Sequence, residues 1–187
     1  MSSELKDILR RVKPDKRRER LKPRAKSQLP FIGPSWEKHT KLLYDTTVYI
    51  DILQSRFPRN AELILRAAEA WHSTVTDAEL ATVCGLLDPV HPGTRVAVEQ
   101  VTAIIERRPA HRTLAPDRQV WLDAGVLAGT LARLQQYGLA DRRRILNDAL
   151  LFSTARKHGL TVLTRNLTDF DLLQQLDPSG RVLFYNT

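Results

Sequence analysis

The stretch that decides the fold reads KLLYDTTVYID at residues 41–51. Its first four residues, Lys41 to Tyr44, are strand-like, Asp45 and Thr46 follow as a tight turn, and apolar residues recur from Val48 onward as in a helix. A strand that runs directly into a helix is typical of a parallel α/β sheet, whose ligands bind outside the carboxyl ends of the strands. We therefore expect Asp45 at a ligand-binding edge of such a sheet.

Three further acids stand at comparable places. Glu79 comes shortly after a predicted strand at 73–75, Asp169 comes shortly after another at 161–163, and Asp148 lies in the apolar, helix-like run 145–152. The carboxyl ends of parallel strands meet at one edge of the sheet, so these acids are expected to converge although they lie far apart in the sequence. Such a cluster of carboxylates indicates a divalent metal site.

Each of these acids also has an ordinary structural explanation. Thr76 and Glu79 have the spacing of a capping box for a helix that extends to about residue 86. Asp148 would cap the start of its own helix, and Thr168 or Asp169 would cap the final helix, which extends to about residue 176. Acids with such separate structural roles would rarely all fall at strand ends of one regular α/β pattern. Their joint placement therefore favours a shared site.

The remaining pattern also alternates between strand-like and helix-like segments. Helical periodicity covers 94–107 and 116–137, with a short edge strand expected at 111–114 between them. Asp123 is expected to be solvated or near the rim of the site, and Asp171 to lie on the exposed first turn of the final helix. Gly159 is expected to end the helix before residue 161 in a left-handed conformation.

Composition sets the limits on the class of protein. The 187 residues, 42% apolar and 27% charged, suit one soluble domain with an extension, and no stretch approaches the roughly 20 apolar residues of a membrane helix. The basic N-terminus lacks the apolar core of a secretory signal, and the lone Cys84 forms no internal disulfide, so a cytoplasmic location is expected. Cys84 itself is expected to be a small buried hydrophobe.

The net charge of +8 is concentrated at the N-terminus. Residues 1–26 hold 11 basic and 4 acidic residues, a net charge of +7, whereas the rest of the chain holds 18 basic and 17 acidic residues, a net charge of +1. Apolar spacing predicts a short amphipathic helix at 5–12 and an irregular basic strap after it. An arm that neutralises phosphates, a flexible solubilising tail and a dimer arm all remain open. The candidate nucleic-acid-binding residues are Arg10, Arg11, Arg17, Arg18, Arg20, Arg142, Arg143 and Arg144.

Four segments together resemble a known family. Residues 43–51, 76–80, 147–150 and 163–170, in this order and at these separations, resemble the PIN-domain nucleases, and most closely the VapC-type toxins of bacterial toxin–antitoxin pairs. The resemblance implies a three-layer α/β/α domain at residues 41–187, with a central parallel sheet of about five strands, after a basic extension at residues 1–40. This sequence departs from the family pattern at Thr47, where Asn or Ser is usual, and in having a longer N-terminal extension.

The resemblance also implies the site residues. Asp45, Glu79, Asp148 and Asp169 are carried over as the acidic quartet, and the groups expected to position the substrate are Thr164, Asn166, Thr47 and Arg165. Four neighbouring carboxylates cannot all stay ionised without a counter-charge, and oxygen ligands favour Mg²⁺ or Mn²⁺. Asp45 and Asp148 are the first choices for direct ligands. The expected reaction is hydrolysis of a phosphodiester bond.

Three functions follow from these observations. The leading one is a metal-dependent endoribonuclease, the toxin of a type II pair, that cuts RNA and is neutralised by a small antitoxin. The resemblance further implies a homodimer, and the lack of a long apolar stretch implies no membrane association. The alternative is a non-catalytic nucleic-acid-binding module that acts through the basic arm. A haloacid-dehalogenase-like phosphatase would need a second Asp where Thr47 stands.

Overall fold

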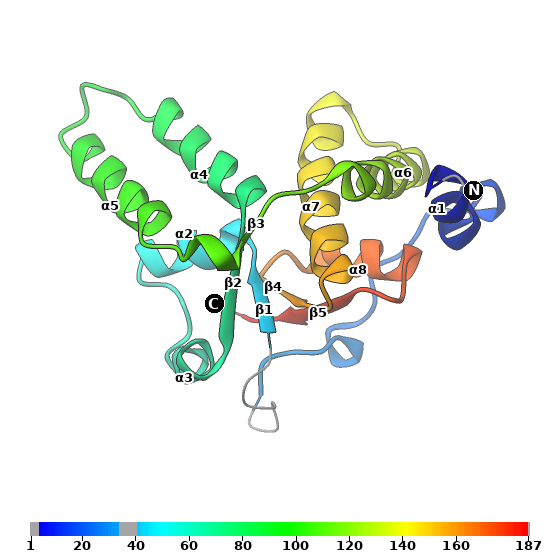
Figure 1. Cartoon of the computed structure of the whole chain (residues 1–187), viewed down its shortest axis with the longest axis horizontal. Coiled ribbons are helices and arrows are strands. Elements are labelled where there is room, and N and C mark those ends of the chain that lie inside the picture. Colours follow the sequence, from blue (N-terminus) through cyan, green and yellow to red (C-terminus); the bar gives the residue numbers. More distant parts are fainter. Residues whose placement is uncertain (1–3, 34–40, 187) are drawn as a thin grey trace.

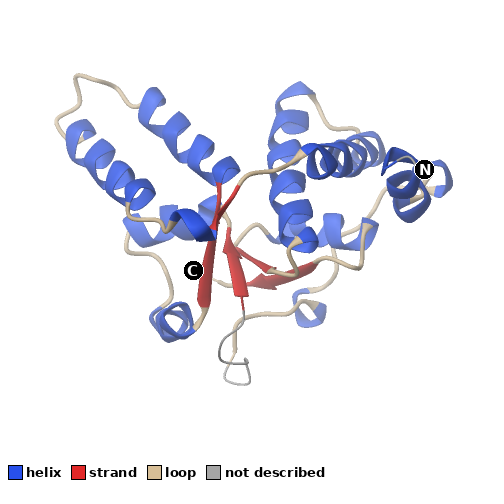
Figure 2. Ribbon diagram, viewed as in Figure 1, coloured by secondary structure: helices blue, strands red, loops and turns tan. Residues whose placement is uncertain are grey.

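A five-stranded, entirely parallel sheet forms the centre of the molecule (Figures 1 and 2). The structure, a computed structural model, describes residues 4–33 and 41–186. The strands are β1 (Lys41–Tyr44), β2 (Glu69–Ser73), β3 (Thr113–Leu114), β4 (Thr161–Thr164) and β5 (Arg181–Phe184), in the spatial order β3-β2-β1-β4-β5. The central place of β1 puts the residue after it at the middle of the carboxyl edge.

Alternation along the strands gives the sheet two apolar faces. Leu43 and Val162 belong to one hydrophobic cluster, whereas their neighbours Leu42 and Leu163 belong to another. Successive strand side chains point to opposite faces, so both faces need a covering layer of helices. This confirms the predicted three-layer α/β/α fold.

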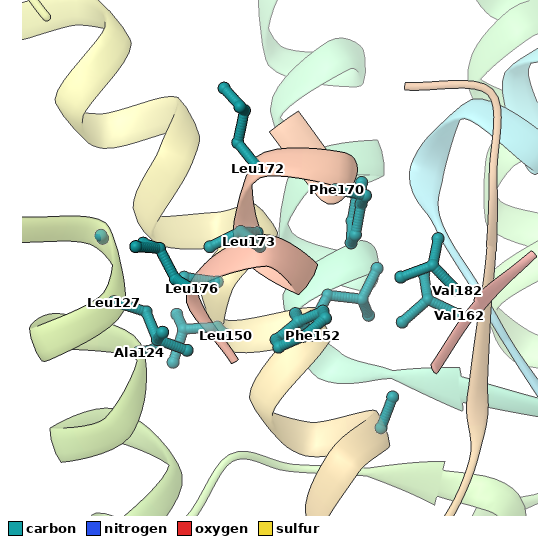
Figure 3. Close-up of a cluster of buried hydrophobic side chains, with 14 of the residues drawn as sticks. Ala124, Leu127, Leu150, Phe152, Val162, Phe170, Leu172, Leu173, Leu176 and Val182 are labelled. Atoms are coloured by element: carbon teal, nitrogen blue, oxygen red, sulfur yellow. The ribbon is translucent and has the colours of Figure 1, made fainter. Parts of the chain in front are cut away.

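The first face is covered by α6 (Arg118–Gln135), α7 (Leu139–Lys157) and α8 (Leu167–Leu176). Figure 3 shows its centre, where Phe152 from α7 and Phe170 from α8 approach Val162 and Val182 of the sheet. Burying one such aromatic side chain stabilises the fold by about 1.5–3 kcal/mol. Gly180, just before β5, is required here, because a Cβ on it would lie 2.1 Å from Cζ of Phe152.

The second face is covered by four helices: α2 (Thr46–Leu53), α3 (Arg59–Ala67), α4 (Thr74–Leu86) and α5 (Thr94–Glu106). Val48, Leu80 and Val101 from these helices pack with Leu42 and Leu183 of the sheet. In Figure 1, α4 and α5 form a hairpin that projects from the body of the molecule. The base of α4 remains against the core, so Glu79 is held close to the sheet edge.

The N-terminal extension packs on the domain. Helix α1 (Glu4–Val12) lies against α6 and buries Ile8 and Val12 in the first cluster. The short 3-10 turns η1 (Pro14–Lys16) and η2 (Lys26–Gln28) lead to Phe31, which forms a parallel bridge with Phe184 and so pairs with the outer side of β5. The predicted amphipathic helix is confirmed, and the described part of the extension is folded onto the domain.

Arginines of the extension bond to groups of the domain. Arg11 forms ion pairs with Asp123 of α6 and with Asp177, at 3.0 Å from the latter, and both carboxylates also pair with Arg156. Further contacts are Arg24 Nε to Asp171 at 2.6 Å, Arg17 Nη2 to the Leu176 carbonyl at 3.2 Å, and Arg20 Nε to Gln135 at 2.9 Å. The prediction of exposed Asp123 and Asp171 was wrong: both are buried, because the extension supplies their counter-charges.

Two element boundaries also differ from the predictions. The strand expected at 73–75 is β2 at 69–73, because Ser73 caps α4 by accepting a hydrogen bond from the Val75 amide at 3.2 Å. The arginines 142–144 lie inside α7, which begins at Leu139 rather than near residue 145. The edge strand before α6 is present as β3, and Gly159 has the expected positive φ of 66°.

Two predictions about the class of protein can be compared with the structure. Over the described residues, no helix is long and apolar enough to cross a membrane. Cys84 is half-buried against the second cluster and is a free thiol.

Candidate active site

Asp45 stands where β1 passes into α2, at the middle of the sheet edge. Its carboxylate is 4% exposed and accepts hydrogen bonds from Thr47 Oγ1 and Thr164 Oγ1, each at 2.7 Å. Burial raises the pKa of Asp45, and the hydrogen bonds from the two threonines oppose this rise only in part. Asp45 is therefore a preorganised but poorly solvated carboxylate.

Asp148 faces the same edge from the middle of α7. It is buried, and its Oδ2 accepts a hydrogen bond of 3.2 Å from Asn166 Nδ2. The pKa of Asp148 is raised well above its ordinary value, first by burial and then by the negative charges of the three other acids. The explanation of Asp148 as a helix cap is wrong, because the helix begins nine residues earlier at Leu139.

Glu79 reaches the edge from α4. Its carboxylate accepts hydrogen bonds from Thr46 Oγ1 and, at 2.9 Å, from Asn147 Nδ2, which places α2, α4 and α7 around one group. Burial raises the pKa of Glu79, the hydrogen bonds lower it, and the charge of Asp45 raises it further. The capping explanation is wrong, because Ser73 caps α4 and Glu79 lies beyond its first turn.

Asp169 lies in the first turn of α8 and is also buried. Arg144 Nη1 forms an ion pair with its Oδ2, Asn166 Nδ2 donates to the same oxygen at 2.9 Å, and Tyr137 Oη donates to Oδ1 at 3.2 Å. The helix cap is Asn166, whose Oδ1 accepts from the Asp169 amide at 3.3 Å, and not Thr168 or Asp169. The Asp169 carboxylate is thus not used for capping, and both of its oxygens are held by side chains around the site.

Residues 164–166 form the loop that links these acids. Thr164 Oγ1 donates to Asp45 and accepts from the Asn166 amide at 2.9 Å, and the Arg165 amide donates to Thr47 Oγ1 at 3.2 Å. The Arg165 side chain lies 2.8 Å from Oδ2 of the buried Asp51. The loop after β4 is therefore fixed to the turn after β1 by both its backbone and its side chains.

These groups surround a cavity of about 450 Å³. Its lining residues are Asp45, Thr46, Thr47, Glu79, Val83, Arg144, Asp148, Arg165 and Asn166. Asp169 is not among these lining residues, but its carboxylate pairs with Arg144, which is. A larger cavity of about 740 Å³ lies between α2 and α5 and contains none of the predicted acids, so chemistry rather than size locates the candidate site.

The predicted basic residues fall into three groups. Arg144 and Arg165 line the cavity, whereas Arg11, Arg17 and Arg20 bond to the domain elsewhere. Of the others, Arg10 is exposed and pairs with Asp7 at 3.1 Å, Arg18 and Arg143 are exposed, and Arg142 Nε donates to the Tyr137 carbonyl at 3.0 Å. Two arginines, Arg144 and Arg165, therefore lie in the wall of the same cavity as the acids.

Sequence reasoning did not assign four residues of this site. Thr46 and Asn147 hold Glu79, Tyr137 holds Asp169, and Asp51 holds Arg165. Thr46 and Asn147 adjoin Asp45 and Asp148 in the sequence, and this adjacency was a usable signal. Tyr137 lies beyond the end of α6, where the sequence pattern is that of an ordinary helix terminus.

Comparison with known protein families identifies the fold. A profile of the PIN domain matches residues 42–173, which include all four acids. The chain belongs to the PIN-domain family. Members of this family are typically nucleases. A search of curated proteins finds no match for this PIN-domain chain.

Solved structures share the fold at low sequence identity. VapBC2 from Rickettsia felis, bound to a DNA fragment from its promoter, has a TM-score of 0.56 at 15% identity, over 79% of this PIN-domain chain and 100% of the matched chain. FitAcB from Neisseria gonorrhoeae has a TM-score of 0.55 at 23% identity, over 78% and 96%. DNA-bound VapBC from Salmonella typhimurium has a TM-score of 0.54 at 21% identity, over 78% and 98%. The matched chains are thus spanned almost completely.

The donor set of this PIN domain fits a hard divalent cation. Asp45 and Asp148 offer buried carboxylate oxygens to one cavity, and burial first, then repulsion by the neighbouring acids, raises the pKa of Asp148. Such repulsion is what a bound cation relieves, and oxygen ligands suit Mg²⁺ or Mn²⁺. Within residues 4–33 and 41–186, however, no three acidic, His or Cys side chains already form a group with metal-ligand spacing. Glu79 and Asp169 are instead held by protein hydrogen bonds.

Proposed function

We propose that this chain is a Mg²⁺- or Mn²⁺-dependent endoribonuclease that hydrolyses RNA phosphodiester bonds. The observation that supports this most is that three carboxylates, one directly after β1, one on α4 and one on α7, line one cavity. Asp45 and Asp148 would hold the cation, with Glu79 and Asp169 completing its environment. A bound cation would polarise the phosphate and lower the pKa of the attacking water.

The protein's own groups would do the remaining work. Asn166 Nδ2 lies between Asp148 and Asp169, and the Thr164 and Thr47 hydroxyls fix the orientation of Asp45. Arg165 and Arg144 line the same cavity and would pair with phosphate oxygens, since a carboxylate-lined mouth otherwise repels RNA. Glu79, whose pKa burial raises, would accept a proton from the attacking water.

The test is cleavage of a structured RNA by the purified protein with Mn²⁺. We expect the wild type to cut the RNA, EDTA to stop the reaction, and Asp148→Asn to reduce it to the level of a blank while the thermal unfolding transition stays cooperative. Glu106→Gln removes an exposed acid at the end of α5 and should cut normally. Cleavage that persists in Asp148→Asn would reject the assigned site.

We further propose that the protein is a toxin held inactive by a small antitoxin protein, and that it forms a homodimer. The similar structures are VapBC and FitAcB assemblies, which favours a protein partner for this chain as well. Expression of the wild type should arrest growth, and Asp45→Asn should restore it. Growth arrest by Asp45→Asn would contradict an RNA-cutting toxin, and sedimentation at increasing concentration measures the oligomeric state.

The alternative, a binding module that uses the basic arm, requires free cations on the extension. Arg10 and Arg18 are exposed, whereas Arg11, Arg17 and Arg20 are occupied by the domain. Because deleting the extension would uncover the core, the informative change is the double variant Arg10→Glu and Arg18→Glu. Loss of salt-sensitive RNA binding in EDTA would support this alternative.

A further inference from the structure

Arg144 is the one cationic side chain that contacts an acid of the quartet in the described structure. Its Nη1 pairs with Oδ2 of Asp169, and its Nη2 lies 3.6 Å from Oδ1 of Asp141. Asp141, Arg144 and Asp148 follow one another at spacings of three and four along α7, so they share one face of the helix. Arg144 therefore stands between an acid of the site and an acid outside it.

The two acids differ in their dependence on Arg144. The Asp169 side chain is 3% exposed, whereas Asp141 and Arg144 are each half-exposed. The other partners of Asp169, Asn166 and Tyr137, are neutral. Arg144 thus supplies the positive charge that a buried carboxylate needs, and its exposed guanidinium is the partner that moves most easily.

We infer that Arg144 is a built-in counter-ion for Asp169, which shifts toward Asp141 when a divalent cation binds to the acids and so becomes available to the RNA phosphate. This rests on the proposed function. Either the Arg144 guanidinium or the divalent metal ion can supply the positive charge that Asp169 needs. Like-charge repulsion opposes placing both of them at Oδ2 of Asp169 at the same time. Arg144 is in this account a positioning residue that competes with the metal and then helps to hold the substrate.

The inference predicts opposite effects for two neighbours. Arg144→Gln removes the competing cation and should tighten Mn²⁺ binding by about 5- to 20-fold, a common size for coupling between two sites. Asp141→Asn removes the alternative partner, leaves Arg144 on Asp169 and should weaken Mn²⁺ binding. A residue with a merely structural role would not improve the affinity for a metal when it is removed.

The experiment is calorimetric titration of the full-length protein with Mn²⁺ alone, without RNA. The matched control is Arg143→Gln, an exposed arginine of the same run with the same loss of charge. Asp141→Asn should lose its effect in the double variant with Arg144→Gln, because it acts through Arg144 rather than through its own charge. Thermal unfolding of each variant checks the fold.

The outcomes separate this inference from the proposed function. Tighter Mn²⁺ binding by Arg144→Gln but not Arg143→Gln supports the inference, even if no RNA is cut. Wild-type cleavage together with equal Mn²⁺ affinity in Arg144→Gln would overturn the inference alone. Absence of Mn²⁺ binding by the wild type would overturn both. An equal gain in both arginine variants would assign the effect to net charge and overturn the inference.

Discussion

Thr164 donates a 2.7 Å hydrogen bond to Oδ2 of Asp45 and thereby joins the end of β4 to the end of β1. The two residues lie 119 positions apart in the sequence. Both are buried, so water cannot replace the bond. The hydroxyl stabilises the charged form of an acid whose pKa burial raises, and the same hydroxyl accepts the Asn166 amide. Thr164 thus favours the ionised form of Asp45 and fixes the position of the Asn166 backbone beside it.

Thr164→Val keeps the shape of the side chain and removes both hydrogen bonds. The pKa of Asp45 should rise further, so the acidic limb of the pH–activity profile moves to higher pH. The free energy of unfolding should fall by about 1–3 kcal/mol. The control is Thr154→Val, a buried threonine whose hydroxyl donates to the Leu150 carbonyl at 2.7 Å within α7. An unmoved acidic limb in Thr164→Val would contradict the role given to this hydroxyl.

Asp148 makes the metal-free protein sensitive to pH. Burial, and then the charges of the other three acids, raise its pKa in the folded state above the ordinary 3.8, so between the two pKa values the folded state binds more protons than the unfolded chain. The stability that this group contributes is fully present below its pKa in the unfolded chain. It is lost as the pH rises through its pKa in the folded state. In EDTA, Asp148→Asn should therefore raise the free energy of unfolding at neutral pH by about 1–3 kcal/mol and have little effect in acid.

Urea denaturation in acid below the ordinary pKa of a carboxyl and again at neutral pH measures this difference. Glu62→Gln, which neutralises an exposed acid on α3, should change stability by less than about 0.5 kcal/mol at either pH. Destabilisation by Asp148→Asn at neutral pH would mean that the Asp148 carboxylate is satisfied without a metal.

Metal binding should stabilise the fold and act through the same acids. Mn²⁺ at about 100 times its dissociation constant should raise the free energy of unfolding by about 2.7 kcal/mol. Thermal unfolding with and without Mn²⁺, at matched ionic strength, is the measurement. We expect Asp45→Asn to lose most of the gain, and a full gain in that variant would place the metal elsewhere.

The extension should contribute to stability through Arg11 rather than through its total charge. Arg11→Met leaves Arg156 as the single positive charge that, among the described residues, is paired with Asp123 and Asp177 and should lower the free energy of unfolding by about 3 kcal/mol. Arg10→Met removes the same charge from a side chain that is 77% exposed and should change it by less than about 0.5 kcal/mol. Equal effects in urea denaturation would mean that the extension is only loosely attached.

The sequence predicted the architecture because the strands that matter are short and apolar on both faces. The run 41–51 forms β1 and most of α2, and the acid after it is at the sheet edge as expected. Asp45, Asp148 and Glu79 line one cavity. The strand before Glu79 was misplaced because Ser73 and Thr74, which resemble strand residues, serve as the cap and first residue of α4.

The errors about buried polar groups share one physical cause, which is that bonds between distant segments leave no local pattern in the sequence. The local sequence predicts Asp123 and Asp171 at the surface. In the structure the extension places Arg11 beside Asp123 and Arg24 beside Asp171. In the same way, nothing in the sequence around Tyr137 indicates that its hydroxyl reaches Asp169. Periodicity reports which face of an element is apolar, but not which partner neutralises a buried polar group.

The central claim is that Asp45 and Asp148 hold a divalent cation in the cavity at the sheet edge. The most direct measurement is anomalous X-ray diffraction from crystals of the full-length protein grown with Mn²⁺. The account predicts an anomalous peak about 2.1 Å from a carboxylate oxygen of each of these two residues. A peak bound only to other residues, or none at this cavity in crystals that contain Mn²⁺, would contradict it.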